Sequence, residues 1–367
     1  MKKIMLVFGT RPEAIKMCPL LKELQKREGF LTRVCVTGQH REMLDGVLSA
    51  FGIVPDHDLC VMKAGQSLRE VTAAVLDRLT PYLTEERPDL VLVHGDTTSA
   101  FAAALACFYL HIPVGHVEAG LRTYDFENPY PEEFNRQAIS LVARYHFSPT
   151  EHSRENLLRE GRDSSRVFVT GNTGLDALKS TVREDYAHPL LSWGQGGCLV
   201  LLTAHRRENL GEAMRAIFRA VRRVCQTHAD VRVVYPVHMN PRVREIAQAE
   251  LEGCENIRLT EPLDVLDFHN LLARCDFVLT DSGGIQEEAA ALGRPVLVMR
   301  ERTERQEGVD TGAITLIGTE EEDVYRRVCG LLDDRTLYES MAKAKNPYGD
   351  GRASQRIADI LERELCP

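Results

Sequence analysis

Three carboxylates lie at or beyond the ends of apolar runs that are typical of buried strands. Asp96 follows the run at 90–94, Glu118 closes the run at 114–118, and Glu132 lies in a loop that prolines fix. In an open α/β sheet, ligands bind at the carboxyl ends of the strands, so these carboxylates indicate acid/base chemistry. Two have simpler alternatives, because Asp96 could cap a helix and Glu132 could begin an exposed one. Neither helix capping nor the start of an exposed helix explains Glu118 as readily, because this residue closes an apolar strand.

The segment Thr280–Glu288 leads from an apolar strand into a helix and is typical of a phosphate-binding loop. Gly283 and Gly284 expose backbone N–H groups at the helix start, and Ser282 adds a hydroxyl donor that suits a diphosphate. Glu288 follows at a position that suits ribose hydroxyls. The alternative is an ordinary helix N-cap. Neither the dinucleotide fingerprint nor the NTPase P-loop is present, so the loop indicates a phosphorylated, nucleotide-linked substrate of another enzyme class.

The formal net charge of -9 argues against general binding of nucleic acid or of an anionic membrane. An anionic ligand therefore needs a local cluster of cations. Arg11 and Lys16 lie near the start of the first predicted helix, where anions are favoured. His205 opens a charged segment at one strand end, and His238 closes another strand. The alternatives are ordinary solvated charges and a packed or water-facing histidine.

The composition is typical of a soluble globular protein, with 44% hydrophobic and 27% charged residues. The apolar run at the N-terminus is too short for a signal peptide, and the uncharged stretch at 100–115 is too short to span a bilayer. Ten cysteines include no Cys-x-x-Cys pair. Neither a zinc site nor a disulfide framework is indicated, and we expect reduced cysteines in a cytosolic protein.

Apolar β-rich runs alternate with helical patterns, which predicts parallel sheets covered on both faces. At 367 residues the chain suits two such α/β domains. We expect an N-terminal domain over 1–175, a linker within 171–197 and a C-terminal domain over 190–350, with a ligand cleft between the domains. The predicted strands are 4–8, 32–37, 90–94, 114–118, 146–148, 167–170, 198–203, 231–237, 257–260, 277–280, 296–299 and 313–317. The predicted helices include 14–27, 99–109, 212–225, 285–292 and 353–365.

Taken in order, these segments resemble the non-hydrolysing UDP-N-acetylglucosamine 2-epimerases almost from end to end. The resemblance is carried by Gly9–Met17, Gln39–Arg41, His94–Thr98, His116–Thr123, Pro131–Glu133, His205–Glu208, Asp281–Glu288 and Asn346–Gly351. It implies a GT-B-like fold of two Rossmann-like doubly wound domains, with the last helix (353–367) packing back on the first. It also implies a cytoplasmic homodimer that needs no cofactor and no metal ion.

The resemblance further implies reversible interconversion of UDP-GlcNAc and UDP-ManNAc, which supplies ManNAc for cell-surface polysaccharide synthesis. By matching position, the catalytic group is Asp96, Glu118, Glu132 and His205. The residues that hold UDP are Arg11, Lys16, His238, Ser282, Gly283, Gly284, Glu288 and Arg305.

Such a reaction has a chemical difficulty that explains the residue types. The proton on the second sugar carbon is not acidic, because no carbonyl adjoins it, and no site for a hydride cofactor is visible. Expelling UDP makes the anomeric carbon cationic and acidifies that proton. Its loss gives a 2-acetamidoglucal, and re-addition of UDP after protonation on the other face gives the epimer. We expect Asp96 and Glu118 or Glu132 to divide the proton transfers, with the acid and the base left open.

Several members of this family also bind UDP-GlcNAc in a second, activating pocket. Gln39, His40 and Gln66 are the matching candidates here, while Glu42 and Gly65 occupy neighbouring positions that vary, so this regulation stays open. The chain departs from the family pattern at Asn128, Ala290 and Gln306. These changes affect loop stiffness without removing a named catalytic group.

Three other functions compete with the epimerase hypothesis. A GT-B glycosyltransferase would need an acceptor and would release UDP. A hydrolysing epimerase would release UDP and free ManNAc. A UDP-sugar sensor would bind UDP-GlcNAc without consuming it and would not need three strand-end carboxylates.

Overall fold

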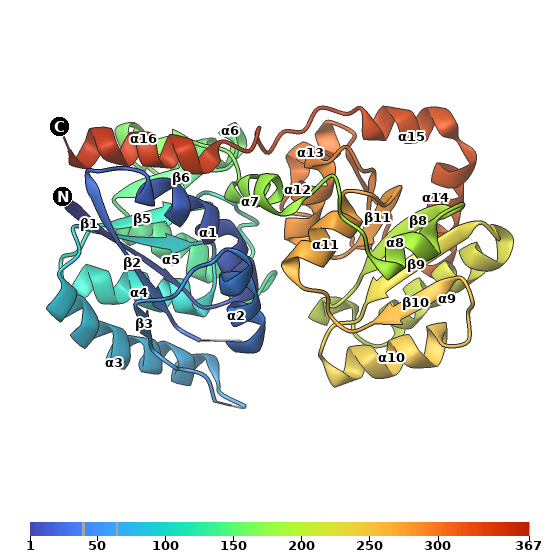
Figure 1. The fold of residues 1–367 in the computed structure, drawn as a ribbon, viewed down its shortest axis with the longest axis horizontal. Helices are drawn as coiled ribbons and strands as arrows, with labels where there is room; N and C mark the ends of the chain where they lie inside the picture. The colour runs from blue at the N-terminus through green and yellow to red at the C-terminus, as the bar shows by residue number, and fades with distance from the viewer. Residues whose placement is uncertain (39–40, 64, 367) are drawn as a thin grey trace. The chain divides into compact units, whose positions relative to one another are not determined.

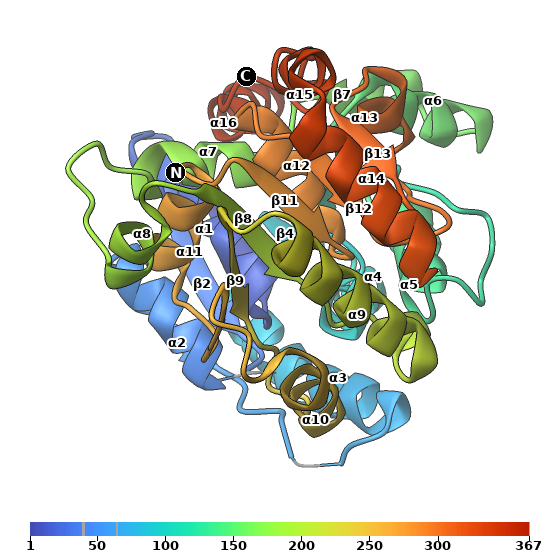
Figure 2. The same cartoon turned by 90° about the vertical axis from the view of Figure 1, so that its right-hand side faces the viewer.

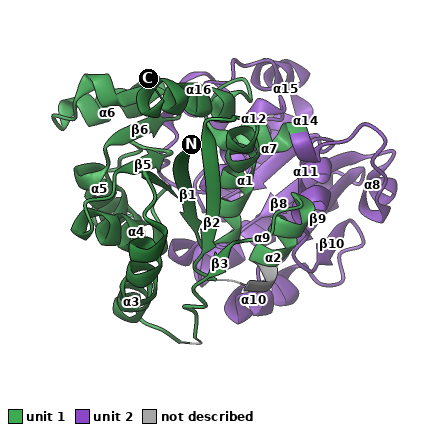
Figure 3. Ribbon diagram, turned by 60° about the vertical axis from the view of Figure 1, so that its left-hand side comes forward, with its two compact units in different colours: residues 1–179, 348–367 green, residues 180–347 purple. Residues whose placement is uncertain are grey.

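The computed structural model describes residues 1–38, 41–63 and 65–366, without the side chains of residues 41–43. The chain divides into two compact units, shown in separate colours in Figure 3. Unit 1 comprises residues 1–179 with 348–367, and unit 2 comprises residues 180–347. Each unit contains one parallel sheet with helices packed on it (Figure 1). The fold class predicted from the sequence, two doubly wound α/β domains, is confirmed.

The sheet of unit 1 has the strand order β3-β2-β1-β4-β5-β6-β7. Its strands are β1 (Lys2–Phe8), β2 (Phe30–Val36), β3 (His57–Asp58), β4 (Leu90–His94), β5 (Val114–Val117), β6 (Tyr145–Ser148) and β7 (Val167–Val169). The order reverses between β1 and β4, since the chain moves outward in one direction from β1 and in the other from β4. Loops at such a reversal leave room for a ligand.

The helices of unit 1 begin and end where local signals favour it. Thr10 caps the first helix, its side chain accepting from the backbone of Glu13 while Glu13 reaches back to the cap, and Pro12 lies in the first turn. The helices are α1 (Arg11–Gln25), α2 (Arg41–Ala50), α3 (Leu68–Glu86), α4 (Thr98–Tyr109), α5 (Glu132–Val142), α6 (Glu151–Arg159), η1 (Ser164–Arg166), α7 (Thr173–Thr181) and α16 (Ala353–Leu365). The last of these packs on α1, and Arg27, two residues beyond the end of α1, contacts Asp359 at 2.6 Å and Glu362 at 3.1 Å.

The sheet of unit 2 has the order β10-β9-β8-β11-β12-β13, which reverses between β8 and β11. Its strands are β8 (Cys198–Thr203), β9 (Val231–Pro236), β10 (Ile257–Thr260), β11 (Phe277–Thr280), β12 (Val296–Val298) and β13 (Ile314–Leu316). Its helices are α8 (Pro189–Gly194), η2 (Arg207–Asn209), α9 (Glu212–Thr227), α10 (Pro241–Leu251), α11 (Val265–Leu272), α12 (Gly283–Ala291), α13 (Gln306–Asp310), α14 (Glu321–Asp333) and α15 (Arg335–Ala342). Figure 2 shows α9 and α14 side by side, in agreement with their contacts.

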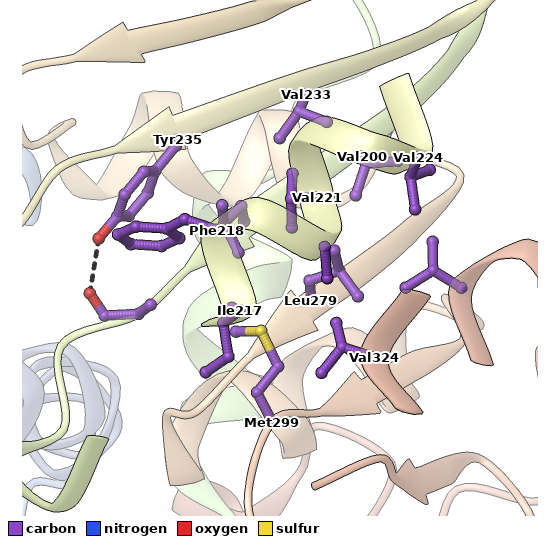
Figure 4. Packing of buried hydrophobic residues seen from close by; sticks show 14 of the residues in the cluster. Val200, Ile217, Phe218, Val221, Val224, Val233, Tyr235, Leu279, Met299 and Val324 are labelled. Carbon is purple, nitrogen blue, oxygen red and sulfur yellow. Dashed lines mark hydrogen bonds between the residues drawn. The ribbon is translucent and has the colours of Figure 1, made fainter. Parts of the chain in front are cut away.

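The core of unit 2 fixes the loop that follows β8. Phe218 and Ile217 of α9 pack with Tyr235 of β9 and neighbouring aliphatic side chains (Figure 4). The only polar atom of the buried Tyr235 side chain, its hydroxyl, donates to the carbonyl of Ala204 at 2.7 Å. Because a buried hydroxyl needs a partner, this bond holds the backbone just before His205 in one place.

The elements agree closely with those predicted. Every predicted strand is present within two residues of its expected ends, and the predicted helices agree within three. The two-residue strand β3 was not predicted, because so short a run has no detectable periodicity. The segment 171–197, predicted as a linker of weak pattern, contains α7 and α8. No described helix is both long and apolar enough to cross a membrane.

Candidate functional site

The side chain of Asp96 is held by α5 and does not cap a helix. Thr97 provides the N-cap of α4, since its hydroxyl accepts from the backbone N–H of Ala100 at 3.0 Å. Asp96 instead accepts from Nη2 of Arg136 at 2.6 Å, and its carbonyl accepts from Nδ2 of Asn135 at 2.8 Å. The capping alternative is therefore wrong. These two contacts hold the carboxylate and the backbone of Asp96 in place just beyond the end of β4.

Glu118 has a left-handed backbone, with φ of +63°, directly after β5. A non-glycine residue in this region is strained, and such strain gathers at functional sites. Its carboxylate forms an ion pair with Lys16 of α1, and Nε2 of His94 lies 3.7 Å from the same oxygen. Burial lowers the pKa of His94 to about 4, with Lys16 adding to the effect and Glu118 opposing it. At neutral pH a neutral imidazole and an ammonium group therefore flank the carboxylate.

Glu132 and Glu133 begin α5 but have different environments. Glu133 is fully buried, and its oxygens accept from the backbone N–H groups of Thr123 at 3.0 Å and Tyr124 at 3.1 Å. It also pairs with Arg136 at 3.1 Å. Glu133 thus braces both the loop after Glu118 and the arginine that holds Asp96. Glu132 is half-buried and begins the helix, as its simpler alternative predicted, but most residues in the first turns of this helix are not exposed, contrary to that alternative. The catalytic role of Glu132 stays a prediction.

A buried carboxylate that sequence reasoning missed, Glu13, connects the loops after β1 and β4. It accepts from the backbone N–H groups of Gly9 at 3.0 Å and Thr10 at 2.8 Å, and from the hydroxyl of Thr97 at 2.7 Å. Burial raises the pKa of Glu13, while these bonds act against the increase. A Cβ atom at Gly9 would lie 1.7 Å from the hydroxyl of Thr37, so only glycine fits there. Glu13 thereby fixes the start of α1, where Arg11 is the first residue.

The backbone of the candidate catalytic histidine His205, in unit 2, is held by a buried aspartate. Asp281 has no exposed surface and accepts from the backbone N–H groups of His205 and Arg206, each at 2.9 Å. Nδ1 of His205 lies 3.5 Å from Asp281, and its ring stacks on that of His238 with centroids 5.2 Å apart. Partial burial lowers the pKa of His205, and the carboxylate of Asp281 opposes the change. This segment is therefore more than a solvated charge run, although Arg207 is exposed.

The helix α12 begins at the candidate phosphate loop after β11. Ser282 is its N-cap residue by position, yet its side chain makes no capping hydrogen bond, so the ordinary N-cap alternative is not supported. A Cβ atom at Gly284 would meet nothing within 4 Å, whereas one at Gly283 would lie 2.7 Å from Nη1 of Arg305. The first amide groups of a helix, with open space before one glycine, suit an anionic ligand.

Arg305 lies next to the start of α12, within a buried network of charged side chains. Its Nε donates to Glu287 at 2.7 Å, and its guanidinium also pairs with Glu304, which contacts Arg300 at 3.1 Å. Burial would raise the pKa of Glu304, but the guanidinium groups of Arg305 and Arg300 lower it well below its ordinary range. Arg305 thus supports α12 in the structure, and its predicted contact with UDP stays a prediction.

The remaining predicted residues lie in different settings. Glu288 is 7% exposed on α12, and His238 is exposed on the loop after β9. Gln66 bonds locally, to the N–H of Lys63 at 2.7 Å and to the carbonyl of Val61 at 3.0 Å. Gln39 and His40 lie outside the described residues. Among the residues that the structure describes, no group of three or more His, Cys, Asp and Glu side chains is placed to hold a metal ion.

Known proteins resemble this chain along nearly its whole length. A family model described as UDP-N-acetylglucosamine 2-epimerase matches residues 22–362. The UDP-N-acetylglucosamine 2-epimerase of Bacillus subtilis is 54% identical over 359 residues, covering 98% of this chain and 94% of that one.

Solved structures agree with these sequence matches. The Listeria monocytogenes protein described as a UDP-N-acetylglucosamine 2-epimerase has a TM-score of 0.97 at 52% identity, covering 100% of this chain and 97% of that one. The Neisseria meningitidis UDP-GlcNAc 2-epimerase, solved bound to UDP-GlcNAc, has a TM-score of 0.94 at 46% identity and covers 98% of this chain and 100% of that one.

Proposed function

Because the chain belongs to the UDP-N-acetylglucosamine 2-epimerase family of isomerases, we propose that it interconverts UDP-GlcNAc and UDP-ManNAc without hydrolysis. The substrate is supported by the Neisseria meningitidis relative, which was solved with UDP-GlcNAc. The reaction proceeds by elimination of UDP to a 2-acetamidoglucal and re-addition on protonation of the other face.

The observation that carries this proposal is the pairing of two strand-end carboxylates with cations. Arg136 contacts Asp96 at 2.6 Å, and Lys16 pairs with Glu118. Both carboxylates follow strands of an open α/β sheet, where ligands bind, so both are assigned to stabilise an oxocarbenium ion or to transfer the proton of the second sugar carbon. Glu132 is the third candidate for proton transfer. Which group acts on which face stays open.

The departing UDP is assigned to the loops of unit 2. The N–H groups at the start of α12, with Ser282, stabilise the negative charge that develops on the diphosphate, and Glu288 accepts from the ribose hydroxyls. His205, held by Asp281, is placed at the end of the neighbouring strand β8 to donate to the same diphosphate. Arg11, Lys16, His238 and Arg305 complete the proposed UDP-binding set.

We propose the oligomeric state, the cellular location and the regulation of the protein from the same resemblance. In this proposal the protein is a cytoplasmic homodimer, needs no cofactor and supplies ManNAc for cell-surface polysaccharide. A second UDP-GlcNAc pocket near Gln39, His40 and Gln66 is part of the hypothesis. Titration of activity against UDP-GlcNAc concentration, with Gln66→Ala as the variant, tests that pocket.

Proton NMR of the purified protein with UDP-GlcNAc in D2O, without acceptor or nicotinamide, tests the function. The expected result is UDP-ManNAc carrying deuterium at the second sugar carbon. Free UDP with free ManNAc would instead identify a hydrolysing enzyme. Binding without conversion, tested with and without excess UDP-GlcNAc as activator, would favour a transferase or a sensor.

A further inference from the structure

A buried histidine that the proposed reaction does not use, His269, lies beside the proposed ribose-binding carboxylate. It belongs to α11 and is 1% exposed. Its Nε2 lies 3.7 Å from Oε2 of Glu288, and its Nδ1 lies 2.7 Å from the hydroxyl of Thr181. The imidazole therefore connects the hydroxyl of Thr181, the last residue of α7, with a carboxylate on α12.

These two neighbours favour one tautomer of His269. If the Thr181 hydroxyl donates to Nδ1, the proton of the neutral ring is on Nε2 and its positive end faces Glu288. The opposite tautomer would direct a ring lone pair at the carboxylate, which is repulsive. The N···O spacing of 3.7 Å exceeds hydrogen-bond length, so the N–H acts on the carboxylate through its dipole.

The hydroxyl that selects this tautomer is itself held in place. Asn270, the next residue on α11, is fully buried, and its Nδ2 donates to the carbonyl of Thr181 at 2.7 Å. Its Oδ1 accepts from the backbone N–H of Arg183 at 3.0 Å. Consecutive residues of one helix therefore fix both the backbone and the hydroxyl of Thr181. This arrangement exceeds what a histidine needs merely to fill space in a core.

We propose that His269 is a positioning residue that holds Glu288 in the orientation that accepts the two hydroxyls of the UDP ribose. Thr181 sets the tautomer on which this depends. The inference rests on the proposed function, in which Glu288 binds the ribose. It makes the site selective for a nucleoside diphosphate with an intact ribose, since a carboxylate held in one orientation can accept from both hydroxyls.

The test compares calorimetric binding of UDP with that of 2′,3′-dideoxyuridine diphosphate, which lacks both ribose hydroxyls. His269→Phe is expected to weaken UDP binding about tenfold and to change binding of the analogue less than about twofold, because a hydrogen bond to a charged group is lost only for UDP. Glu288→Gln is expected to show the same pattern. His269→Gln, which keeps a donor near Nε2, should restore part of the affinity. Thr181→Val should give a smaller loss of the same kind.

His228→Gln is the matched control, because His228 is a histidine of the same unit that pairs with Asp333 at 3.1 Å, away from α12. The proposal would be overturned if His269→Phe and His269→Gln lost affinity for UDP and for the analogue equally, or lost affinity for neither. Failure of the proposed function would look different. The selectivity between UDP and its analogue would survive in the wild type and depend on His269, while NMR showed no epimerisation.

Discussion

The chemistry assigned to the site depends on how single side chains are paired. Asp96 faces Arg136 and Glu118 faces Lys16, so each carboxylate that follows a strand has its own cation. In the proposed reaction, Asp96 and Glu118 transfer the proton or stabilise a cationic anomeric carbon, with the acid and the base left open.

Replacing Asp96 with Asn tests this assignment. Turnover should fall by about two to four orders of magnitude, the usual contribution of a positioned acid or base, because an amide neither takes the proton nor stabilises the cation. UDP affinity should stay within about threefold, since UDP is assigned to other residues. Steady-state kinetics with calorimetric UDP binding measure both quantities. Asp77→Asn, at an exposed position of α3, is the control. Unchanged turnover in Asp96→Asn removes this residue from the catalytic set.

At the scale of the element, each candidate site lies where the strand order of its sheet reverses. In unit 1 the loops after β1 and β4 carry Arg11 and Asp96, and in unit 2 the loops after β8 and β11 carry His205 and Ser282. Ligands of open α/β sheets bind at this position because the connections diverge there. Within each unit, the strand order therefore explains why candidate residues that are far apart in the sequence lie at the same edge of the sheet.

The start of α5 offers a matched pair of neighbouring glutamates. Glu133→Gln should lower the free energy of unfolding by about 2 kcal/mol, because it disturbs two backbone bonds and an ion pair in a fully buried place. Glu132→Gln should leave stability nearly unchanged and reduce turnover. Chemical denaturation and steady-state kinetics separate the two effects. If both variants lost turnover equally with no loss of stability, the distinction between a structural Glu133 and a catalytic Glu132 would be wrong.

The two glycines of α12 form a second matched pair. The new methyl group in Gly284→Ala would have no atom within 4 Å, so the free energy of unfolding should stay the same or rise by up to about 1 kcal/mol. UDP should bind more weakly, because the methyl group occupies the space assigned to the diphosphate. Gly283→Ala meets Nη1 of Arg305 at 2.7 Å and should destabilise the protein. Thermal unfolding and UDP calorimetry measure the difference. Normal UDP affinity in Gly284→Ala would exclude this approach of the diphosphate.

The sequence predicted the helices and strands, but it did not predict the contacts on which the roles of individual residues depend. Alternating apolar runs located the strands because burial on both faces leaves a local pattern. Whether Asp96 caps a helix depends on the side chains of Asn135 and Arg136, which are 39 and 40 positions away. The structural role of Glu133 depends on backbone N–H groups that are 9 and 10 positions away. Such pairings leave no periodic signal. Glu13 and His269 were missed for the same reason, since burial of a charged or polar residue becomes visible only with its partners.

At the scale of the whole molecule, buried histidines make stability depend on pH. Burial lowers the pKa of His94 and of His146 to about 4, and that of His116 to about 3. Each binds a proton in the unfolded chain near pH 6.5 but stays neutral in the folded one, so their contribution is present above pH 6.5 and is lost as the pH falls towards 4. Glu13 and Asp176 act in the opposite sense, because burial raises their pKa.

His146→Gln isolates one of these contributions. His146 lies near Arg162, Arg122 and Glu160, and the two arginines add to the lowering of its pKa. Between pH 6.5 and pH 5 the wild type should lose about 1.6 kcal/mol more unfolding free energy than the variant, because the slope reaches 1.36 kcal/mol for each pH unit only once the unfolded histidine is fully protonated. Urea denaturation at several pH values measures this difference. The exposed His152→Gln is the control. A difference that does not change with pH would contradict the assignment.

We propose that UDP leaves the sugar and returns during each epimerisation. Positional isotope exchange tests it most directly, with UDP-GlcNAc carrying oxygen-18 in the bridge between the anomeric carbon and the β-phosphate. If UDP is released within the site, rotation of the freed β-phosphate moves the label into a non-bridging position. Phosphorus NMR should then show the label scrambling in recovered UDP-GlcNAc as well as in UDP-ManNAc, at a rate comparable with epimerisation. Epimerisation that proceeds while every label stays in the bridge would contradict elimination and re-addition.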